Sequence, residues 1–187
     1  MRTLATAIST TILLPTLALT GCGATTATKP LPHIAFKSPA IQHTTLPARY
    51  TCDGRNTPPP LEWGAVPAGV TQLLLFVIGY TPEPATNTNK VSIEWAVAGL
   101  NPALHKLTAG TLPPGAYQGL NSNSKLGYSI CPEKGHRVQY QFELYGLPPT
   151  TTISPDFAAA SIITSLTEQH TTTPPTAYGA FAATYKR

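Results

Sequence analysis

Charged residues are scarce in this sequence. Only 11% of its 187 residues are Asp, Glu, Lys or Arg, and the formal net charge is +4. The basic residues are scattered, so they form no patch of the kind that binds nucleic acid, and we expect no nucleic-acid partner. The hydrophobic fraction of 42% is enough for a packed core, and the length favours a single domain behind a leader.

The short motifs of several common enzyme classes are also missing. The sequence contains no G-x-S-x-G nucleophile elbow, no P-loop, no dinucleotide-binding glycine motif and no H-E-x-x-H zinc motif. His33, His43 and His105 lie in segments without strand or helix periodicity, where surface histidines are common. We therefore expect a protein that is not an enzyme and has no cofactor.

Cysteine is rare, and the first of the three cysteines ends an N-terminal leader. Arg2 precedes an uncharged stretch rich in Leu, Ala, Ile and Thr, which is typical of a secretory signal. The stretch closes with Leu19-Thr20-Gly21-Cys22, which resembles a bacterial lipobox. We predict a lipoprotein signal peptide over 1–21, a lipid on Cys22, a tether over 22–33 and a domain over 34–187. Acyl chains would make the membrane a partner and anchor the protein in the bacterial cell envelope, outside the cytoplasm.

The two remaining cysteines, Cys52 and Cys131, form an even pair outside the cytoplasm, which favours a disulfide. A metal site is the alternative, but two thiols without a nearby pair of histidines make a poor zinc site. We expect no metal.

Hydrophobic periodicity predicts a mostly β protein. The 20 prolines argue against an all-helical fold, and a continuous apolar run at 72–78 is typical of a strand buried on both faces. Period-two alternation at 91–97 and 138–144 predicts two further strands, and shorter ones are expected at 34–37 and 178–185. One C-terminal helix is expected from Phe157 to about Gln169, started by Ser154-Pro155-Asp156 and followed by His170. Residues 101–133 are rich in Gly, Pro, Asn and Ser, as in a long loop that forms a site.

Residues 50–63, Y-T-C-D-G-R-N-T-P-P-P-L-E-W, combine a turn with a rigid proline segment. This stretch resembles the opening motif of the phosphatidylethanolamine-binding proteins, in their bacterial Raf-kinase-inhibitor-like branch. Further segments that resemble the family are Ile93-Glu94-Trp95, Gly119-Leu120-Asn121, Gly127-Tyr128, Cys131-Pro132 and Tyr185-Lys186-Arg187. The resemblance covers residues 36–187. It implies a large antiparallel Greek-key sheet packed on a smaller one, with helices at one end and a small anion pocket at one edge.

The anion-binding residues that the resemblance implies are replaced in this chain. The Asp-Pro-Asp-Ala-Pro segment of the family aligns with residues 80–84, so both Asp positions are lost. The His before Trp95 becomes Glu94, and the His two residues before Tyr140 becomes Val138, although a register slip would bring His136 to the rim. A carboxylate repels phosphate, so we expect a degenerate anion pocket. The candidate ligand-pocket residues are Asp53, Tyr80, Glu94, Trp95, Pro132 and Tyr140.

The chain keeps the motifs of the fold but lacks the anion-binding residues, and this combination predicts a binding module. Its ligand would be small and neutral, cationic or apolar, or its partner would be an envelope protein. One alternative is a weak hydrolase with Glu94 as the base and Tyr80 or Tyr140 as a polar partner. Another, implied by the resemblance, is an inhibitor of an envelope protease or kinase. Glu94 itself is either a buried carboxylate with a raised pKa or a rim carboxylate paired with Lys or Arg.

Overall fold

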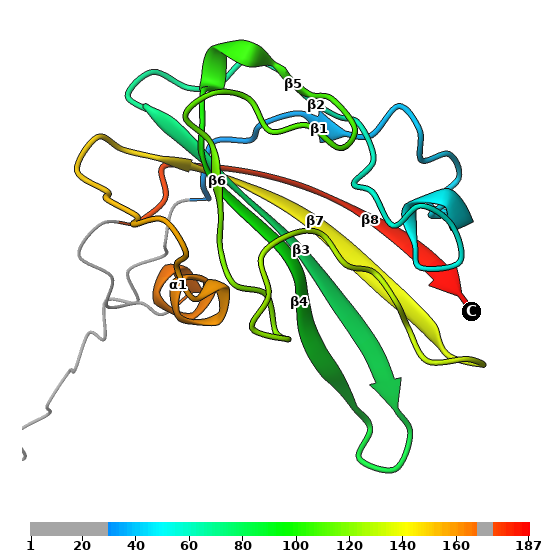
Figure 1. Cartoon of the computed structure of the whole chain (residues 1–187). Coiled ribbons are helices and arrows are strands. Elements are labelled where there is room, and N and C mark those ends of the chain that lie inside the picture. The colour runs from blue at the N-terminus through cyan, green and yellow to red at the C-terminus, as the bar shows by residue number, and fades with distance from the viewer. Residues whose placement is uncertain (1–29, 168–173) are drawn as a thin grey trace, which may run out of the picture.

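The computed structural model describes residues 30–167 and 174–187. Two antiparallel sheets and one α-helix are stacked as three layers, with the smaller sheet on one face of the larger sheet and the helix on the other (Figure 1). The large sheet has the strand order β6-β4-β3-β7-β8, with bounds β6 Tyr117–Gln118, β4 Thr88–Leu100, β3 Gln72–Glu83, β7 Arg137–Leu147 and β8 Ala177–Lys186. The small sheet has the order β1-β2-β5, with bounds β1 Phe36–Lys37, β2 Leu61–Trp63 and β5 Lys106–Leu107. The predicted fold class, mostly β with a C-terminal helix, is confirmed.

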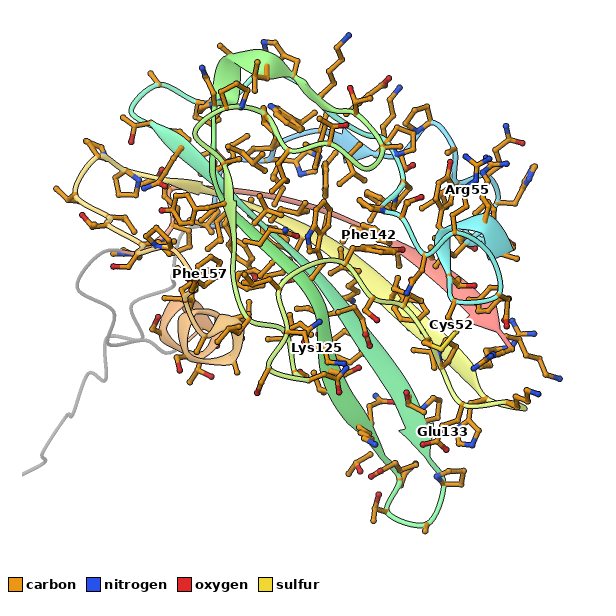
Figure 2. All side chains as sticks on the ribbon, viewed as in Figure 1. Cys52, Arg55, Lys125, Glu133, Phe142 and Phe157 are labelled. Carbon is orange, nitrogen blue, oxygen red and sulfur yellow. A yellow bond between two sulfur atoms is a disulfide. The ribbon has the colours of Figure 1, made fainter. Side chains whose placement is uncertain are left out.

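The core has two parts because the central strands are covered on both faces. Side chains such as Trp95, Tyr140 and Phe142 pack between the two sheets, where Phe142 stacks on Phe181 with ring centroids 4.7 Å apart (Figure 2). A second cluster, which includes Phe157, lies between the large sheet and the helix (Figure 2). The apolar run at 72–78 forms the first part of β3 and contributes to both clusters, as its lack of alternation predicted.

The helix α1 spans Ala159–Thr167 and begins later than predicted. Asp156 has a φ of 59°, in the left-handed region, so Ser154-Pro155-Asp156 forms a turn before the helix and not its first turn. The amide of Ala159 donates instead to the carbonyl of Leu120, which ties the start of the helix to the long loop. The predicted end at Gln169 and the position of His170 lie outside the described residues. Over the described ranges, no helix is both long and apolar enough to cross a membrane.

Candidate functional site

A β-bulge in β4 decides which side chains reach the end of the large sheet. Val77 pairs with Trp95, but the next β3 residue, Ile78, pairs with Ile93, so Glu94 is an extra residue on β4. As a result, Ile93 packs in the cluster under α1, whereas Trp95 packs between the sheets. The simple alternation predicted for 91–97 is therefore wrong at this point, and Glu94 lies on the same face as Trp95.

A cavity of about 500 Å³ lies at this end of the large sheet. Its walls come from the end of β3, the start of β4, the start of β7 and the loop that precedes β7. The lining residues are Thr81, Pro82, Glu83, Lys90, Val91, Ser92, Glu94, Ser122, Asn123, Cys131, Pro132, Glu133, His136, Val138 and Tyr140. Three strands of the large sheet and a loop held by a disulfide thus converge on one hollow.

Glu94 is half-buried, whereas the other two carboxylates that line this cavity, those of Glu83 and Glu133, are exposed. Burial raises the pKa of Glu94, and a hydrogen bond of 2.6 Å donated by the Ser92 hydroxyl opposes part of that rise. The facing residue on β3 is Gly79, where an added Cβ would come within 2.9 Å of the Glu94 carboxylate and 3.2 Å of the Tyr140 ring. Three ion pairs occur among the described residues, and none of them includes Glu94. The structure therefore supports a half-buried carboxylate with a raised pKa over a rim carboxylate paired with Lys or Arg.

The long loop closes the free edge of β4 beside the bulge. The amide of Ile93 donates to the Ser122 hydroxyl over 2.7 Å, and the amide of Ser122 donates to the Ile93 carbonyl over 3.0 Å. The amide of Ser129 donates to the Glu94 carbonyl over 3.1 Å. Asn121 holds this loop in shape, since its side-chain oxygen accepts from the amides of two later loop residues. Backbone groups of β4 that lie beyond its short pairing with β6 find hydrogen-bond partners in this way.

A disulfide and a clasp at the C-terminus hold the opposite wall. Cys52 and Cys131 are joined, with Cα atoms 5.1 Å apart, as predicted. The Arg187 guanidinium donates to the Asp53 carboxylate over 2.9 Å and to the Pro132 carbonyl over 3.3 Å. The Tyr185 hydroxyl donates to the other Asp53 oxygen over 2.7 Å. The hydrogen bond from Tyr185 is the largest cause that holds the pKa of Asp53 below its usual value. Desolvation opposes it, and the hydrogen bond and charge of Arg187 add to the lowering.

Three of the six candidate pocket residues line the cavity: Glu94, Pro132 and Tyr140. The other three lie elsewhere. Asp53 belongs to the C-terminal clasp, behind the cavity wall. Tyr80 packs in the cluster on the α1 face of the large sheet. Trp95 is a core residue whose indole N–H donates to the Gln118 side chain over 2.7 Å.

Sequence reasoning also missed several polar residues of the cavity. Ser92 and Ser122 gave no signal, because a lone serine in a strand or loop is common. Lys90 and Glu83 lie near the turn of the β3–β4 hairpin, and the sequence indicates no more than charged residues near a turn. His136 does line the cavity, as the register slip allowed.

The charges around the cavity disfavour an anion. Its carboxylates are Glu83, Glu94 and Glu133, whereas its basic groups are Lys90 and His136, and the imidazole of His136 lies 3.9 Å from the carboxylate of Glu133. No cluster of three metal-ligating side chains occurs among residues 30–167 and 174–187. The cavity presents hydrogen-bonding groups, an aromatic ring and an excess of negative charge.

The fold and the cavity define a β-sandwich protein with a hollow at one end of its large sheet. The sequence model of the phosphatidylethanolamine-binding protein matches residues 36–181. The chain therefore belongs to the phosphatidylethanolamine-binding protein family.

Individual relatives agree with this membership. A UPF0098 protein of Methanothermobacter thermautotrophicus is 34% identical over 128 residues, which is 65% of this chain and 80% of that protein. A protein named as lipoprotein LppC, from Mycobacterium tuberculosis, is 31% identical over 59% of this chain, and the match spans about half of its length, 53%. Among solved structures, the Chlamydia trachomatis homolog CT736 superposes with a TM-score of 0.69 at 24% identity, covering 83% of this chain and 98% of that chain. Escherichia coli YbcL gives 0.66 at 24% identity, covering 82% and 98%. At this identity the two structures support the fold alone.

Proposed function

We propose that the protein is a lipid-anchored binding module of the cell envelope, with residues 1–21 as its signal peptide and Cys22 as its lipid-attachment site. The lipobox at Cys22 supports this proposal, and so does the similarity to LppC. Binding is the role proposed for the cavity because the sequence contains no G-x-S-x-G elbow, P-loop, dinucleotide-binding glycine motif or H-E-x-x-H motif.

The ligand that we propose is small and carries no negative charge at the end that meets Glu94. The carboxylate of Glu94 carries this proposal, because it lies in the cavity where an anion would have to pair with a donor. Desolvation raises the free energy of the charged Glu94 carboxylate, and a bound ammonium group or hydrogen-bond donor would lower it. A neutral or cationic ligand fits this site better than a phosphate does.

Isothermal titration with a matched pair of ligands tests the proposal. Ethanolamine and phosphoethanolamine differ only in the phosphate group, and inorganic phosphate and O-phosphotyrosine test the anion alone. We expect any saturable binding to be confined to ligands without the phosphate, and we expect Glu94→Gln to weaken it. Tight binding of inorganic phosphate by the wild-type chain would overturn the proposal.

A weak hydrolase is the second candidate, and the raised pKa of Glu94 is the observation that favours it, since a general base works best with a pKa near the working pH. An activity screen on esters and phosphoesters, with wild type and Glu94→Gln side by side, separates the two roles. Equal background rates in both chains would end the hydrolase hypothesis and leave binding as the function of the cavity.

A further inference from the structure

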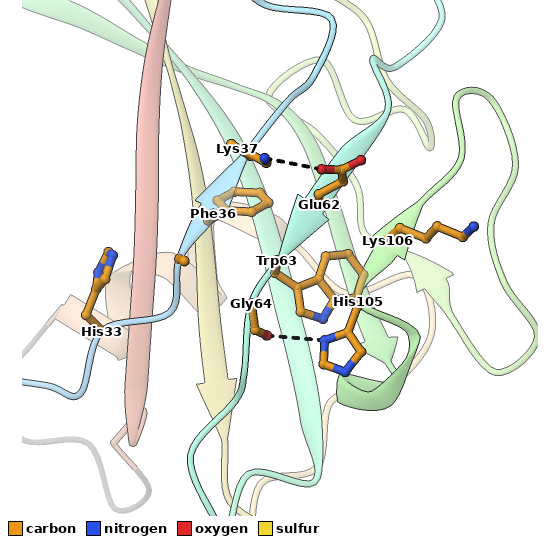
Figure 3. Close-up of a pocket in the computed structure, with 9 residues that line it drawn as sticks. His33, Phe36, Lys37, Glu62, Trp63, Gly64, His105 and Lys106 are labelled. Carbon is orange, nitrogen blue, oxygen red and sulfur yellow. Dashed lines mark hydrogen bonds and ion pairs between the residues drawn. The ribbon is translucent and has the colours of Figure 1, made fainter.

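A second hollow, of about 690 Å³, lies on the small sheet and is separate from the cavity at Glu94 (Figure 3). We call it the small-sheet groove; its lining residues are His33, Ala35, Phe36, Lys37, Glu62, Trp63, Gly64, His105 and Lys106. His33 lies at one end of the groove, and His105 and Lys106 lie at the other (Figure 3). None of these residues takes part in the cavity or its clasp.

The groove has an excess of basic side chains. Lys37 pairs in register with Glu62, which pairs with Lys106, so one carboxylate lies in the row between two ammonium groups. The Lys37 ammonium is 3.6 Å from the Glu62 carboxylate, which leaves Lys106 as the uncompensated charge of this row. His33 and His105 are both exposed, so each adds a positive charge wherever it is protonated.

Two exposed leucines flank the groove. Leu31 is 42% exposed and precedes the lining residue His33 by two positions, and Leu104 is 41% exposed and directly precedes His105. Only two other large hydrophobic residues are exposed among the described residues, Val91 and Leu126, and neither lines the groove. Exposed leucines beside lysines are typical of a surface that meets the headgroup region of a bilayer.

The chain that leads to the lipid enters at this groove. His33 is only eleven residues after Cys22, and eleven extended residues span at most about 40 Å. A lipid on Cys22 therefore holds the small-sheet groove close to the bilayer, where even weak contacts act at a high local concentration.

We infer that the small-sheet groove is a membrane-docking surface, which lies on the anionic bilayer that holds the lipid of Cys22. This inference rests on the proposed lipid attachment. In this orientation, the β3–β4 hairpin points away from the bilayer, because it extends from the molecule opposite the small sheet (Figure 1). Residues of that hairpin line the cavity at Glu94, so the cavity lies on the side of the molecule away from the bilayer.

Quenching of tryptophan fluorescence by brominated lipid tests the orientation. The chain from Cys22 onward keeps every described residue, and its Cys22 thiol can be coupled to a maleimide phospholipid because the other two cysteines are bonded to each other. Leu104→Trp places a probe beside the groove, and Val91→Trp places a matched probe at an exposed hydrophobic position on β4. The wild type supplies the baseline, since its native tryptophans Trp63, which lines the groove, and Trp95 are present in every chain that is compared.

In vesicles of brominated phosphatidylglycerol, we expect Leu104→Trp to lose fluorescence and Val91→Trp to match the wild-type baseline. Adding Lys37→Gln and Lys106→Gln to the Leu104→Trp chain should remove most of the quenching. Equal quenching at both probes would overturn the docking surface and would favour a protein partner for the groove. Quenching that is unchanged by the two lysine substitutions would overturn the electrostatic basis of the docking. Because the coupling imposes the anchor, these outcomes are distinct from a failure of lipid attachment in cells, which would refute the proposed function instead.

Discussion

Exchanging two cavity residues for histidine should create a phosphate site in this protein. Glu94 and Val138 both line the cavity, and the double variant Glu94→His, Val138→His removes the half-buried carboxylate and adds two imidazole donors. A hydrogen bond to a charged group contributes about 1.5–3 kcal/mol, so two contribute about 3–6 kcal/mol. Since about 1.4 kcal/mol is a tenfold change, the affinity should rise by about 10² to 10⁴.

Isothermal titration with inorganic phosphate measures this change directly. Binding to the double variant should weaken as the pH rises through about 6.5, where an unperturbed imidazole loses its proton. The matched control is Tyr80→His, Gln139→His, because these two residues pair across β3 and β7 and lie on the other face of the sheet. Phosphate binding by the wild type at the affinity of the double variant would refute the reasoning, and so would equal binding by the control.

Three further predictions concern the anchor, the disulfide and the clasp. Labelled palmitate should be incorporated by the wild type and by a Thr25→Ala control, but not by Cys22→Ala; label in the cysteine variant would contradict the lipid site. Cys52 and Cys131 are 79 positions apart, so replacing both by alanine opens a long loop and should lower the free energy of unfolding by about 4.5 kcal/mol. Denaturant titration measures this change, and an unchanged midpoint would contradict the prediction. Because the pKa of Asp53 is lowered, its stabilisation is present above the unfolded value of 3.8 and is lost as the pH falls through the folded value. Acid unfolding of Asp53→Asn should therefore be less steep below pH 3.8 than that of the wild type, and identical profiles would speak against the clasp.

The strands were predictable because one physical rule governs each of them. Residues 73–78 are apolar throughout because β3 is covered by the small sheet on one face and by the α1 layer on the other. The alternation at 138–144 holds because β7 keeps an unbroken register with β3. The disulfide was predictable from the even number of thiols that remain after Cys22.

The chemistry of the site depends on local irregularities of the strands, above all the β4 bulge, that the sequence pattern does not predict. An unbroken strand would put Glu94 and Trp95 on opposite faces, and only the β4 bulge puts both on the side of the small sheet. Tyr80 was expected in the pocket because its neighbours resemble a pocket segment, yet the β3 residue that faces Glu94 is Gly79. A one-residue difference in register reverses the face of a side chain, so no argument from spacing alone could separate these two residues.

The two proposals together restrict the source of the ligand. If the small-sheet groove lies on the bilayer, the hairpin that carries Lys90 points away from it, and a headgroup still embedded in that bilayer cannot reach Glu94. The carboxylate of Glu94 independently disfavours the phosphate that such a headgroup carries. Under these two proposals, position and charge agree, and we expect the ligand of this cavity to be a small molecule in solution on the outer side of the anchoring membrane.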